Sequence, residues 1–438
     1  MVSKMNEQVK LCEIEKHFEN VIGYNSIKKE MIRICDIMRN TDFYSKLGVS
    51  VPNGLLLSGE PGLGKTLMAN CFIKASGRKA FTCRKDKPDG DFVKHIKATF
   101  DEAVKNAPSI VFLDDMDKFS ANGDEYHRNS EEFVTVQSCI DEIKGKDVFV
   151  LSTINDNNAI PKSLLRAGRF DNRIEVEPPK GEDAERIVEH YIKRKNFVSE
   201  VDVRTITRLL NGASCAELET VINEAGMHAG FKRKDKIEMD DIVRACLRII
   251  HKAPEKENAY DKEVLRAVAF HEAGHAVIAE CLEPGSVNFV SVRSHGGSTG
   301  GFTNYYQPEE YWIKKQYMEN RVIVLLGGKA STEVVFGETD IGANNDLHRA
   351  FDICERFVDN YCSNSFDRWV QDREHSSGVV ERRDMQMAVE MEKFYATAKK
   401  ILVNNREFLD KLAYALMEKD ILTNIEIQEI KATCKMVA

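Results

Sequence analysis

The chain has 438 residues, a length that suits two to four domains. Its composition, with 42% hydrophobic and 30% charged residues, is that of an ordinary soluble globular protein. Acidic residues outnumber basic ones by 70 to 62, which argues against a general nucleic-acid-binding protein because such proteins carry a basic excess.

The cysteine pattern and the N-terminus indicate a cytoplasmic protein. The 11 cysteines form no CxxC pair and no regular framework, as expected of reduced thiols. Residues 1–16 are polar and charged, unlike a signal peptide. No apolar stretch approaches the roughly 20 residues that span a bilayer, so we expect no membrane segment in this chain, and membrane association only if an anchor is missing from it.

After a polar segment, residues 1–19, the first predicted domain covers residues 20–180. In it, apolar runs typical of buried parallel strands alternate with amphipathic helices, which is an α/β layout. The predicted strands are Gly54–Leu57, Ser109–Leu113, Val148–Ser152 and Arg173–Val176.

A phosphate-binding loop follows the first of these strands. Residues 59–66 fit the pattern G-x-x-x-x-G-K-[ST] in full. The glycines let backbone N–H groups turn toward phosphate oxygens, and the helix that begins there adds its positive dipole end. Lys65 is expected to reach the β- and γ-phosphates of ATP, and Thr66 to ligate Mg²⁺. The predicted nucleotide contacts are Gly59, Glu60, Pro61, Gly62, Leu63, Gly64, Lys65, Thr66 and Leu67.

Two carboxylates follow the second predicted strand. Asp114 is expected to hold Mg²⁺ through water, and Asp115 stands where a base that orients the attacking water is expected. Alone, the pair also fits a solvated acidic strand end. The phosphate loop upstream favours the catalytic interpretation.

With these residues in place, the chain resembles the AAA proteases of the FtsH family. Asn20–Tyr24 matches the nucleotide-facing segment of that family, which implies a nucleotide contact from Ile22. Asn155, after the third predicted strand, falls at the family's polar sensor. The resemblance implies a P-loop AAA module in which a parallel sheet is flanked by helices.

The resemblance also implies a ring-shaped motor, usually a hexamer. Residues 164–171 match the family's LLRPGRFD segment, with Ala167 in place of proline, so that Arg166 and Arg169 become arginine fingers toward the neighbouring subunit's nucleotide. An isolated arginine pair is more often part of surface salt bridges. The chain departs from the family at Asp115, where the family has Glu, and at residues 88–90, where Pro-Asp-Gly replaces the aromatic triplet that grips substrate.

Residues 181–252 have helical spacing and form a predicted helical lid of the AAA module. The polar stretch His251–Tyr260 is typical of a linker. The last predicted domain, residues 253–438, is mostly helical.

This last domain contains H-E-x-x-H, formed by His271, Glu272 and His275. Residues four apart share one face of a helix, so both imidazoles can ligate one metal ion. Zinc lowers the pKa of the water it binds to about 7, and Glu272 lies where it can take the proton. The alternative is a hydrogen-bonded histidine pair in a helix core.

A catalytic zinc ion needs a third protein ligand. By resemblance to the FtsH family, the segment Gly342–Leu347 carries it as Asp346, and Glu333 orients a ligating histidine. Asp346 also fits a helix N-cap. His348 and His295 are rival ligands.

Two further segments complete the domain. The alternating segment Val287–Val292, followed by Gly296–Tyr305, resembles the strand of these proteases that pairs with substrate, although a solvent-exposed hairpin fits equally well. The stretch Met385–Val437 is predicted to be helical.

Together these features predict an ATP-dependent zinc endopeptidase: a P-loop AAA module with a helical lid, followed by a mainly helical zinc metalloprotease domain. We expect Zn²⁺, ATP and Mg²⁺ as cofactors, protein or peptide substrates, a homo-hexamer, and a role in protein quality control. One alternative is a zinc peptidase with a weak or nucleotide-gated motor, suggested by Asp115 and residues 88–90. Another is a remodelling ATPase with a vestigial protease site, which the intact His-Glu-His-Asp set disfavours.

Overall fold

The structure is a computed structural model that divides the chain into two compact units. Unit 1 consists of Met1–Asn196 and Gly212–Ile222, and unit 2 of Phe197–Asn211 and Asn223–Ala438. The domain boundaries expected near residues 180 and 252 stay predictions. The structure describes residues 12–49, 51–85, 91–119, 130–166, 168–197, 202–253, 261–293, 300–306, 314–338, 341–357 and 377–437. In these ranges no helix combines the length and the apolar character that crossing a bilayer requires.

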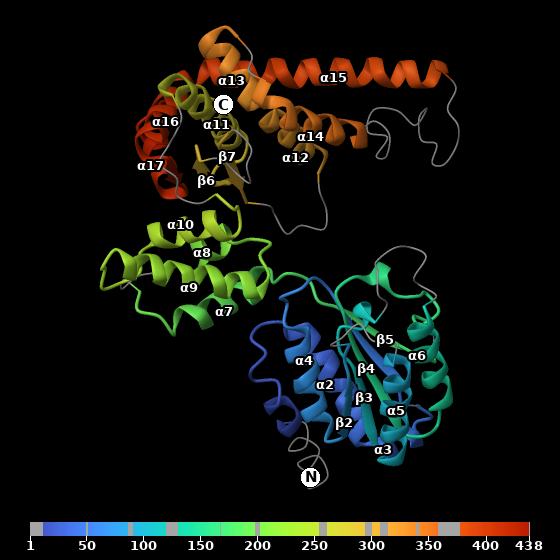
Figure 1. Cartoon of the computed structure of the whole chain (residues 1–438). Coiled ribbons are helices and arrows are strands. Elements are labelled where there is room, and N and C mark those ends of the chain that lie inside the picture. The colour runs from blue at the N-terminus through green and yellow to red at the C-terminus, as the bar shows by residue number, and fades with distance from the viewer. Residues whose placement is uncertain are drawn as a thin grey trace. The chain divides into compact units, whose positions relative to one another are not determined.

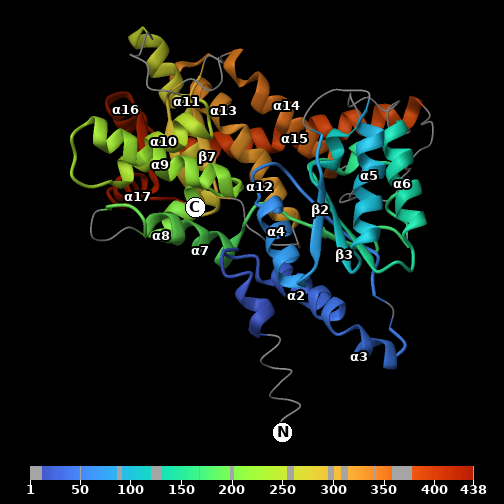
Figure 2. The same cartoon turned by 60° about the horizontal axis from the view of Figure 1, so that its bottom comes forward.

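A five-stranded parallel sheet is the centre of unit 1, with the strand order β2-β3-β4-β1-β5. Its strands are β1 (Gly54–Ser58), β2 (Lys79–Cys83), β3 (Ser109–Leu113), β4 (Val148–Ile154) and β5 (Asn172–Glu175). Because parallel strands need crossover connections, helices cover both faces (Figures 1 and 2). On one face lie α2 (Asn25–Arg39) and α4 (Lys65–Ser76), and on the other α5 (Phe92–Lys105) and α6 (Glu131–Glu142). This confirms the predicted α/β fold.

Apolar runs hold this sheet between its helix layers. Every residue of β1, β3 and β4 is buried. On one face Phe72 of α4 packs on Phe149 of β4, with ring centroids 5.5 Å apart, and on the other Phe92 packs on Phe119 at 4.8 Å. Burying one such side chain stabilises the folded state by about 1.5–3 kcal/mol. The strands that were predicted from their apolar runs therefore stabilise the unit.

Strand β2 was not among the predicted strands. It lies at the edge of the sheet, and only its last residue, Cys83, is buried. The exposed Lys79 and Thr82 interrupt the apolar run by which a fully buried strand is recognised. The prediction missed β2 for this reason.

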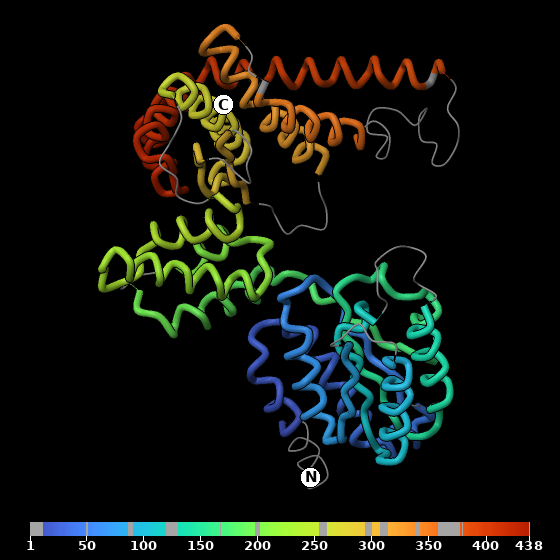
Figure 3. Tube along the Cα trace, viewed as in Figure 1, coloured from blue at the N-terminus to red at the C-terminus, as the bar shows by residue number. Residues whose placement is uncertain are grey.

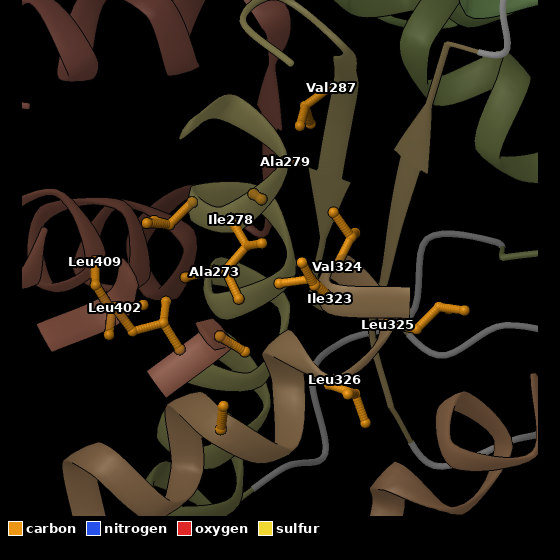
Figure 4. Packing of buried hydrophobic residues seen from close by; sticks show 14 of the residues in the cluster. Ala273, Ile278, Ala279, Val287, Ile323, Val324, Leu325, Leu326, Leu402 and Leu409 are labelled. Atoms are coloured by element: carbon orange, nitrogen blue, oxygen red, sulfur yellow. The ribbon is translucent and has the colours of Figure 1, made fainter. Parts of the chain in front are cut away.

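Helix α11 (Lys262–Leu282) is the centre of unit 2. It packs against α12 (Lys315–Leu325), α13 (Gly327–Phe336), α15 (Ser377–Asn404) and α16 (Arg406–Lys419). Figure 4 shows Ala273 and Ile278 of α11 between Ile323 on one side and Leu402 and Leu409 on the other. Helix α15 runs for 28 residues, and Figure 3 traces it as one long element.

Shorter described elements complete the two units. Those of unit 1 are α3 (Thr41–Lys46), α7 (Gly181–Ile192) and the 3₁₀ turns η1 (Met116–Lys118) and η3 (Asn157–Ala159). Those of unit 2 are α8 (Val203–Leu209), α10 (Met239–Ile249), η4 (Ile341–Ala343), α14 (Asn344–Glu355) and α17 (Asn424–Ala432). Helix α9 (Cys215–Phe231) begins in unit 1 and ends in unit 2.

A small antiparallel sheet lies beside α11 in the order β7-β6-β8. Its strands are β6 (Val287–Ser291), β7 (Phe302–Tyr305) and β8 (Ile421–Thr423). The expectation that residues 385–437 are all helical was wrong at β8. This strand has three residues and directly follows the left-handed Asp420, and so short a strand has no periodicity to separate it from the flanking helices.

Candidate active sites

The phosphate loop connects β1 to α4, as the sequence predicts. Gly59, Gly62 and Gly64 have φ angles of 144°, 82° and 85°, values that favour glycine. At Gly59 a Cβ atom would also lie 2.1 Å from the carbonyl oxygen of Val176. Helix α4 begins at Lys65, so its first N–H groups, which have no partner within the helix, adjoin the loop.

Lys65 is buried inside this loop. Its ammonium group donates hydrogen bonds of 2.7 Å to the carbonyl oxygens of Gly59 and Glu60. Burial lowers the pKa of Lys65, and the nearby Asp115 carboxylate acts against that shift. Among the other predicted nucleotide contacts, Leu63 is buried, Gly64 is half-buried, and Glu60, Pro61, Gly62, Thr66 and Leu67 are exposed.

Thr66 and Asp114 meet at the end of β3. The Thr66 hydroxyl donates a 3.2 Å hydrogen bond to Oδ1 of Asp114, which also accepts one of 2.8 Å from Thr153. The side chain of Asp114 is buried. A hydroxyl and a carboxylate are oxygen ligands of the kind that Mg²⁺ prefers, so this pair suits the predicted magnesium site.

Asp115 and Asn155 also lie together. The Asn155 amide donates to Asp115 Oδ1 at 3.4 Å and to Asp117 Oδ2 at 3.2 Å, and Lys118 Nζ lies 2.7 Å from Asp115 Oδ2. Burial raises the pKa of the Asp115 carboxyl, but Lys118, Asn155 and Arg84 together outweigh it and lower that pKa. The predicted base is therefore ionised at neutral pH.

The segment that contains Ile22 is connected to the phosphate loop through α9. The Tyr24 hydroxyl lies 3.5 Å from Sγ of Cys215, the first residue of α9, and the Ala216 N–H donates a 3.0 Å hydrogen bond to the Gly62 carbonyl oxygen. Ile22 itself is half-buried. Its contact with nucleotide stays a prediction.

The predicted arginine fingers precede β5. Arg169 forms a 2.7 Å ion pair with Asp141 of α6. Arg169, together with Lys144, lowers the pKa of the Asp141 carboxyl to about 2. Arg166 is exposed. Arg169 is thus held by its own chain, and the contact of both arginines with a neighbouring subunit stays a prediction.

In unit 2, His271, Glu272 and His275 lie on α11, a helix of 21 residues. All three side chains are buried. Nδ1 of His275 lies 2.7 Å from the carbonyl oxygen of Val324 on α12. When Nδ1 donates its proton to that carbonyl, Nε2 keeps a lone pair for a metal ion.

Asp346 of α14 meets both histidines. Its Oδ2 lies 3.3 Å from Nε2 of His271 and 3.2 Å from Nε2 of His275, and the two Nε2 atoms are 3.2 Å apart. Ligand atoms about 2.0–2.1 Å from a tetrahedral zinc ion lie about 3.3 Å from one another, so the triangle has the size that zinc requires. Within the described ranges, no other group of three His, Cys, Asp or Glu side chains converges in this way.

The N-cap alternative for Asp346 was wrong. Asp346 lies inside the first turn of α14, whose N-cap residue is Ala343. Burial raises the pKa of the Asp346 carboxyl, but His275 and His271 outweigh burial and hold it well below its usual range. The carboxylate is therefore charged and faces the histidines.

Glu272 faces strand β7. The Thr303 hydroxyl donates a 2.9 Å hydrogen bond to Oε2 of Glu272. A Cβ atom at Gly301 would lie 2.7 Å from Cγ of Glu272, so the strand runs directly against this side chain. Burial raises the pKa of Glu272 although His271 and His275 act against that shift, and a raised pKa suits a carboxylate that takes up a proton.

Glycines that the sequence analysis did not single out make room for this site. A Cβ atom at Gly328 would lie 2.4 Å from Nε2 of His271 and 2.6 Å from Nε2 of His275, the two atoms that would ligate a metal ion. A Cβ atom at Gly274 would lie 2.5 Å from the carbonyl oxygen of Gly327, so α11 and α13 cross with their backbones in contact. Glycine is unfavourable inside helices, so the two consecutive glycines at 327–328 were the feature of the sequence from which this close packing could have been predicted.

One expectation about a neighbouring residue was not met, and one of the two rival ligands lies outside the site. Glu333 accepts hydrogen bonds from Tyr395 and, at 3.3 Å, from Lys399, so it joins α13 to α15 rather than orienting a ligating histidine. His348 is exposed and outside the His-His-Asp group. The other rival ligand, His295, lies outside the described residues, as do residues 88–90 and Ala167.

Comparison with known proteins matches both parts of the chain. Residues 55–178 match the ATPase family associated with various cellular activities (AAA), and residues 258–430 match peptidase family M41. The phosphate loop lies in the first range and the His-His-Asp group in the second.

Curated relatives match most of the chain. The ATP-dependent zinc metalloprotease FtsH 2 of Thermoanaerobacter sp. (strain X514) is 31% identical over 425 residues, which cover 94% of this chain and 82% of the relative. The ATP-dependent zinc metalloprotease FtsH of Helicobacter felis is 30% identical over 458 residues, which cover 97% of this chain and 72% of the relative. The chain therefore belongs to the FtsH family, the AAA-type ATP-dependent zinc metalloproteases.

Proposed function

We propose that the chain is an ATP-dependent zinc endopeptidase in which His271, His275 and Asp346 hold the zinc ion and Glu272 is the general base. The observation that carries this proposal is the triangle of ligand atoms 3.2–3.3 Å apart, next to a glycine whose Cβ would fill the space beside them. Three protein ligands leave the fourth zinc position open, as in catalytic sites. Zinc, when bound, supplies Lewis-acid chemistry to peptide hydrolysis.

The surrounding residues orient the groups and move the proton. Glu272 takes a proton from the attacking water and passes it to the leaving amine. Thr303 fixes the Glu272 carboxylate by its hydrogen bond of 2.9 Å. The Val324 carbonyl keeps the His275 ring in one orientation.

We propose that strand β7 binds the substrate backbone. It is an edge strand of the small sheet, so an extended peptide can pair with it. Thr303 of β7 is bonded to Glu272, which brings a peptide on this strand close to the general base. Backbone pairing does not depend on side chains, as a protease with many protein substrates requires.

We propose that unit 1 is the motor. Lys65, Thr66 and Asp114 bind Mg²⁺ and ATP, Asp115 orients the attacking water, and Asn155 acts as the polar sensor. Arg166 and Arg169 act on the nucleotide of a neighbouring copy in a homo-hexameric ring. Arg166 is exposed, whereas the Arg169 guanidinium is bonded to Asp141 and to the Ser163 carbonyl oxygen, contacts that it exchanges for the neighbour's nucleotide in this proposal.

We also propose a cytoplasmic enzyme of protein quality control that binds no nucleic acid. All ten cysteines in the described part of the chain are free thiols, as in a reducing compartment. The net charge of -8 disfavours polyanionic partners.

The experiment compares degradation of a folded and an unfolded protein substrate, each with and without ATP. We expect Glu272→Gln to retain zinc and ATP turnover but to lose cleavage, and Lys65→Ala to retain zinc but to lose ATP-dependent degradation. Glu263→Gln, which removes an exposed charge from the same helix α11, is the matched control for Glu272→Gln. A zinc-loaded Glu272→Gln variant that cleaves as fast as the wild type would contradict the assignment of the base.

A further inference from the structure

We propose that Arg84 is a further residue of the phosphoryl-transfer site and that it acts on the nucleotide bound to its own subunit. The proposal rests on the proposed roles of Asp114 and Asp115, because these are the carboxylates that Arg84 contacts. It differs from the roles proposed for Arg166 and Arg169, which act across a subunit boundary.

The sheet register places Arg84 at the site. Strand β2 ends at Cys83, which is paired with Leu113 at the end of β3. The N–H of Asp114 donates a 3.1 Å hydrogen bond to the carbonyl oxygen of Cys83. Arg84 and Asp114 are therefore the first residues beyond two neighbouring strands, at the carboxyl edge where open α/β sheets bind their ligands.

The side chain of Arg84 points toward the two carboxylates. Nη1 lies 3.3 Å from Oδ2 of Asp114, and Nη2 lies 3.7 Å from Oδ2 of Asp115. The next residue, Lys85, is bonded elsewhere, to Glu132 at 3.2 Å. Of the two described residues that follow β2, Arg84 is thus the one that reaches both carboxylates.

The two oxygens of Asp114 are divided between different partners. Oδ1 accepts from Thr66, the proposed magnesium ligand, and from Thr153, whereas Oδ2 faces Arg84. A planar guanidinium can contact two acceptors at once, which a lysine ammonium does less well. Arg84 therefore fixes the carboxylate that holds the metal relative to the carboxylate that orients water.

A guanidinium at this place also suits the charge of the reaction. The transferring phosphoryl group carries negative charge that cationic groups stabilise in the transition state. The Arg84 side chain is 53% exposed, so solvent and a ligand can reach it. If Asp114 and Asp115 act on the γ-phosphate as proposed, the charge of Arg84 lies next to the reacting group.

The alternative is a surface ion pair without a role in turnover, and kinetics distinguish the two. Steady-state ATP hydrolysis and binding of a fluorescent ATP analogue with Mg²⁺ are measured on the full chain carrying Arg84→Ala or Arg84→Lys. Lys79→Ala is the matched control, because it removes an exposed positive charge from the other end of β2. Asp115→Asn is measured in the same assays.

We expect Arg84→Ala to lower kcat at least about tenfold, short of the roughly 10²–10³-fold loss when an enclosed donor is removed. Analogue affinity stays within about threefold of the wild type, because a transition-state interaction is lost rather than binding. The kcat of Arg84→Lys lies between those of Arg84→Ala and the wild type, and the kcat of Lys79→Ala matches that of the wild type. Unchanged kcat in Arg84→Ala, or loss of analogue binding in both Arg84 variants, overturns the proposal.

Two comparisons distinguish a failure of the role proposed for Arg84 from a failure of the role proposed for Asp115. If Asp115→Asn hydrolyses ATP at the wild-type rate, the proposed role of Asp115 fails. If Asp115→Asn is inactive while Arg84→Ala is fully active, only the role of Arg84 fails. Mixing Arg84→Ala with Lys65→Ala subunits tests the action within one subunit: turnover no higher than that of Arg84→Ala alone supports it, and turnover restored above that level shows that Arg84 acts on a neighbouring nucleotide and overturns it.

Discussion

At the scale of single residues, the zinc site depends on a glycine, Gly328, as much as on its ligands. We expect Gly328→Ala to lose zinc, because the added Cβ would lie 2.4 Å from Nε2 of His271 and 2.6 Å from Nε2 of His275. Zinc content, measured by mass spectrometry, and casein cleavage should fall together by at least about tenfold, while ATP turnover persists.

The matched control for this variant is Gly378→Ala in α15, where a Cβ atom meets nothing within 4 Å. It should keep both zinc and cleavage. A Gly328→Ala variant that retains one zinc ion per chain would show that the space beside the histidines is not where the metal binds.

The residues that the sequence predicted well are those whose geometry is local. The phosphate loop and the histidine pair depend on spacing within one turn, so both could be recognised in the printed sequence. Asp346 came only from resemblance, because no local pattern links it to α11. Gly328 was missed, and Glu333 was misassigned, because both depend on how α13 faces α11 and α15.

At the scale of elements, the strands that were predicted show a local sequence pattern, whereas those that were missed depend on distant contacts. Strands β1, β3 and β4 are buried along their whole length and show it as apolar runs. Strand β2 is half-exposed at an edge, and β8 has three residues. Their strand conformation follows from pairing with distant segments, which a local pattern does not record.

Glu280 shows how one side chain fixes the end of α11 to two other elements. Its fully buried carboxylate accepts from the N–H groups of Gly285 and Val287, at 2.9 and 3.2 Å, and from Lys431 of α17 at 2.9 Å. Burial raises the pKa of Glu280, but these partners, together with Gln428, outweigh it and lower the pKa.

We expect Glu280→Gln to lower the free energy of unfolding at pH 7 by about 3 kcal/mol, because it leaves the ammonium of Lys431 without its charged partner. The folded-state pKa of Glu280 lies below the unfolded value of about 4.3. Its stabilisation is therefore complete above the unfolded value and is lost as the pH falls through the folded value. The difference in the free energy of unfolding between Glu280→Gln and the wild type should therefore shrink as the pH falls.

Urea unfolding followed by circular dichroism at several pH values measures this deficit. Glu429→Gln, which removes an exposed carboxylate from α17, the helix that carries Lys431, should match the wild type throughout. A deficit of equal size at pH 7 and at pH 2 would mean that the ionised carboxylate of Glu280 is not its source.

At the scale of the whole molecule, each unit has a buried core and a ligand site of its own. One cluster of buried side chains surrounds the parallel sheet of unit 1, and another surrounds α11 in unit 2. The phosphate loop belongs entirely to unit 1, and the His-His-Asp group belongs entirely to unit 2. Ligands should therefore stabilise the two units separately, since a ligand stabilises the structure that binds it.

Differential scanning calorimetry tests this separation. We expect removal of zinc by 1,10-phenanthroline to lower the melting temperature of unit 2 and to stop peptide cleavage, while Mg²⁺ and ATP raise the melting temperature of unit 1. A ligand at 1,000 times its Kd contributes about 4 kcal/mol, which moves a melting transition by several degrees. ATP hydrolysis should continue without zinc, because the oxygen groups of Thr66 and Asp114 prefer Mg²⁺. If chelation stopped hydrolysis and lowered both transitions equally, zinc would stabilise the whole chain rather than unit 2 alone.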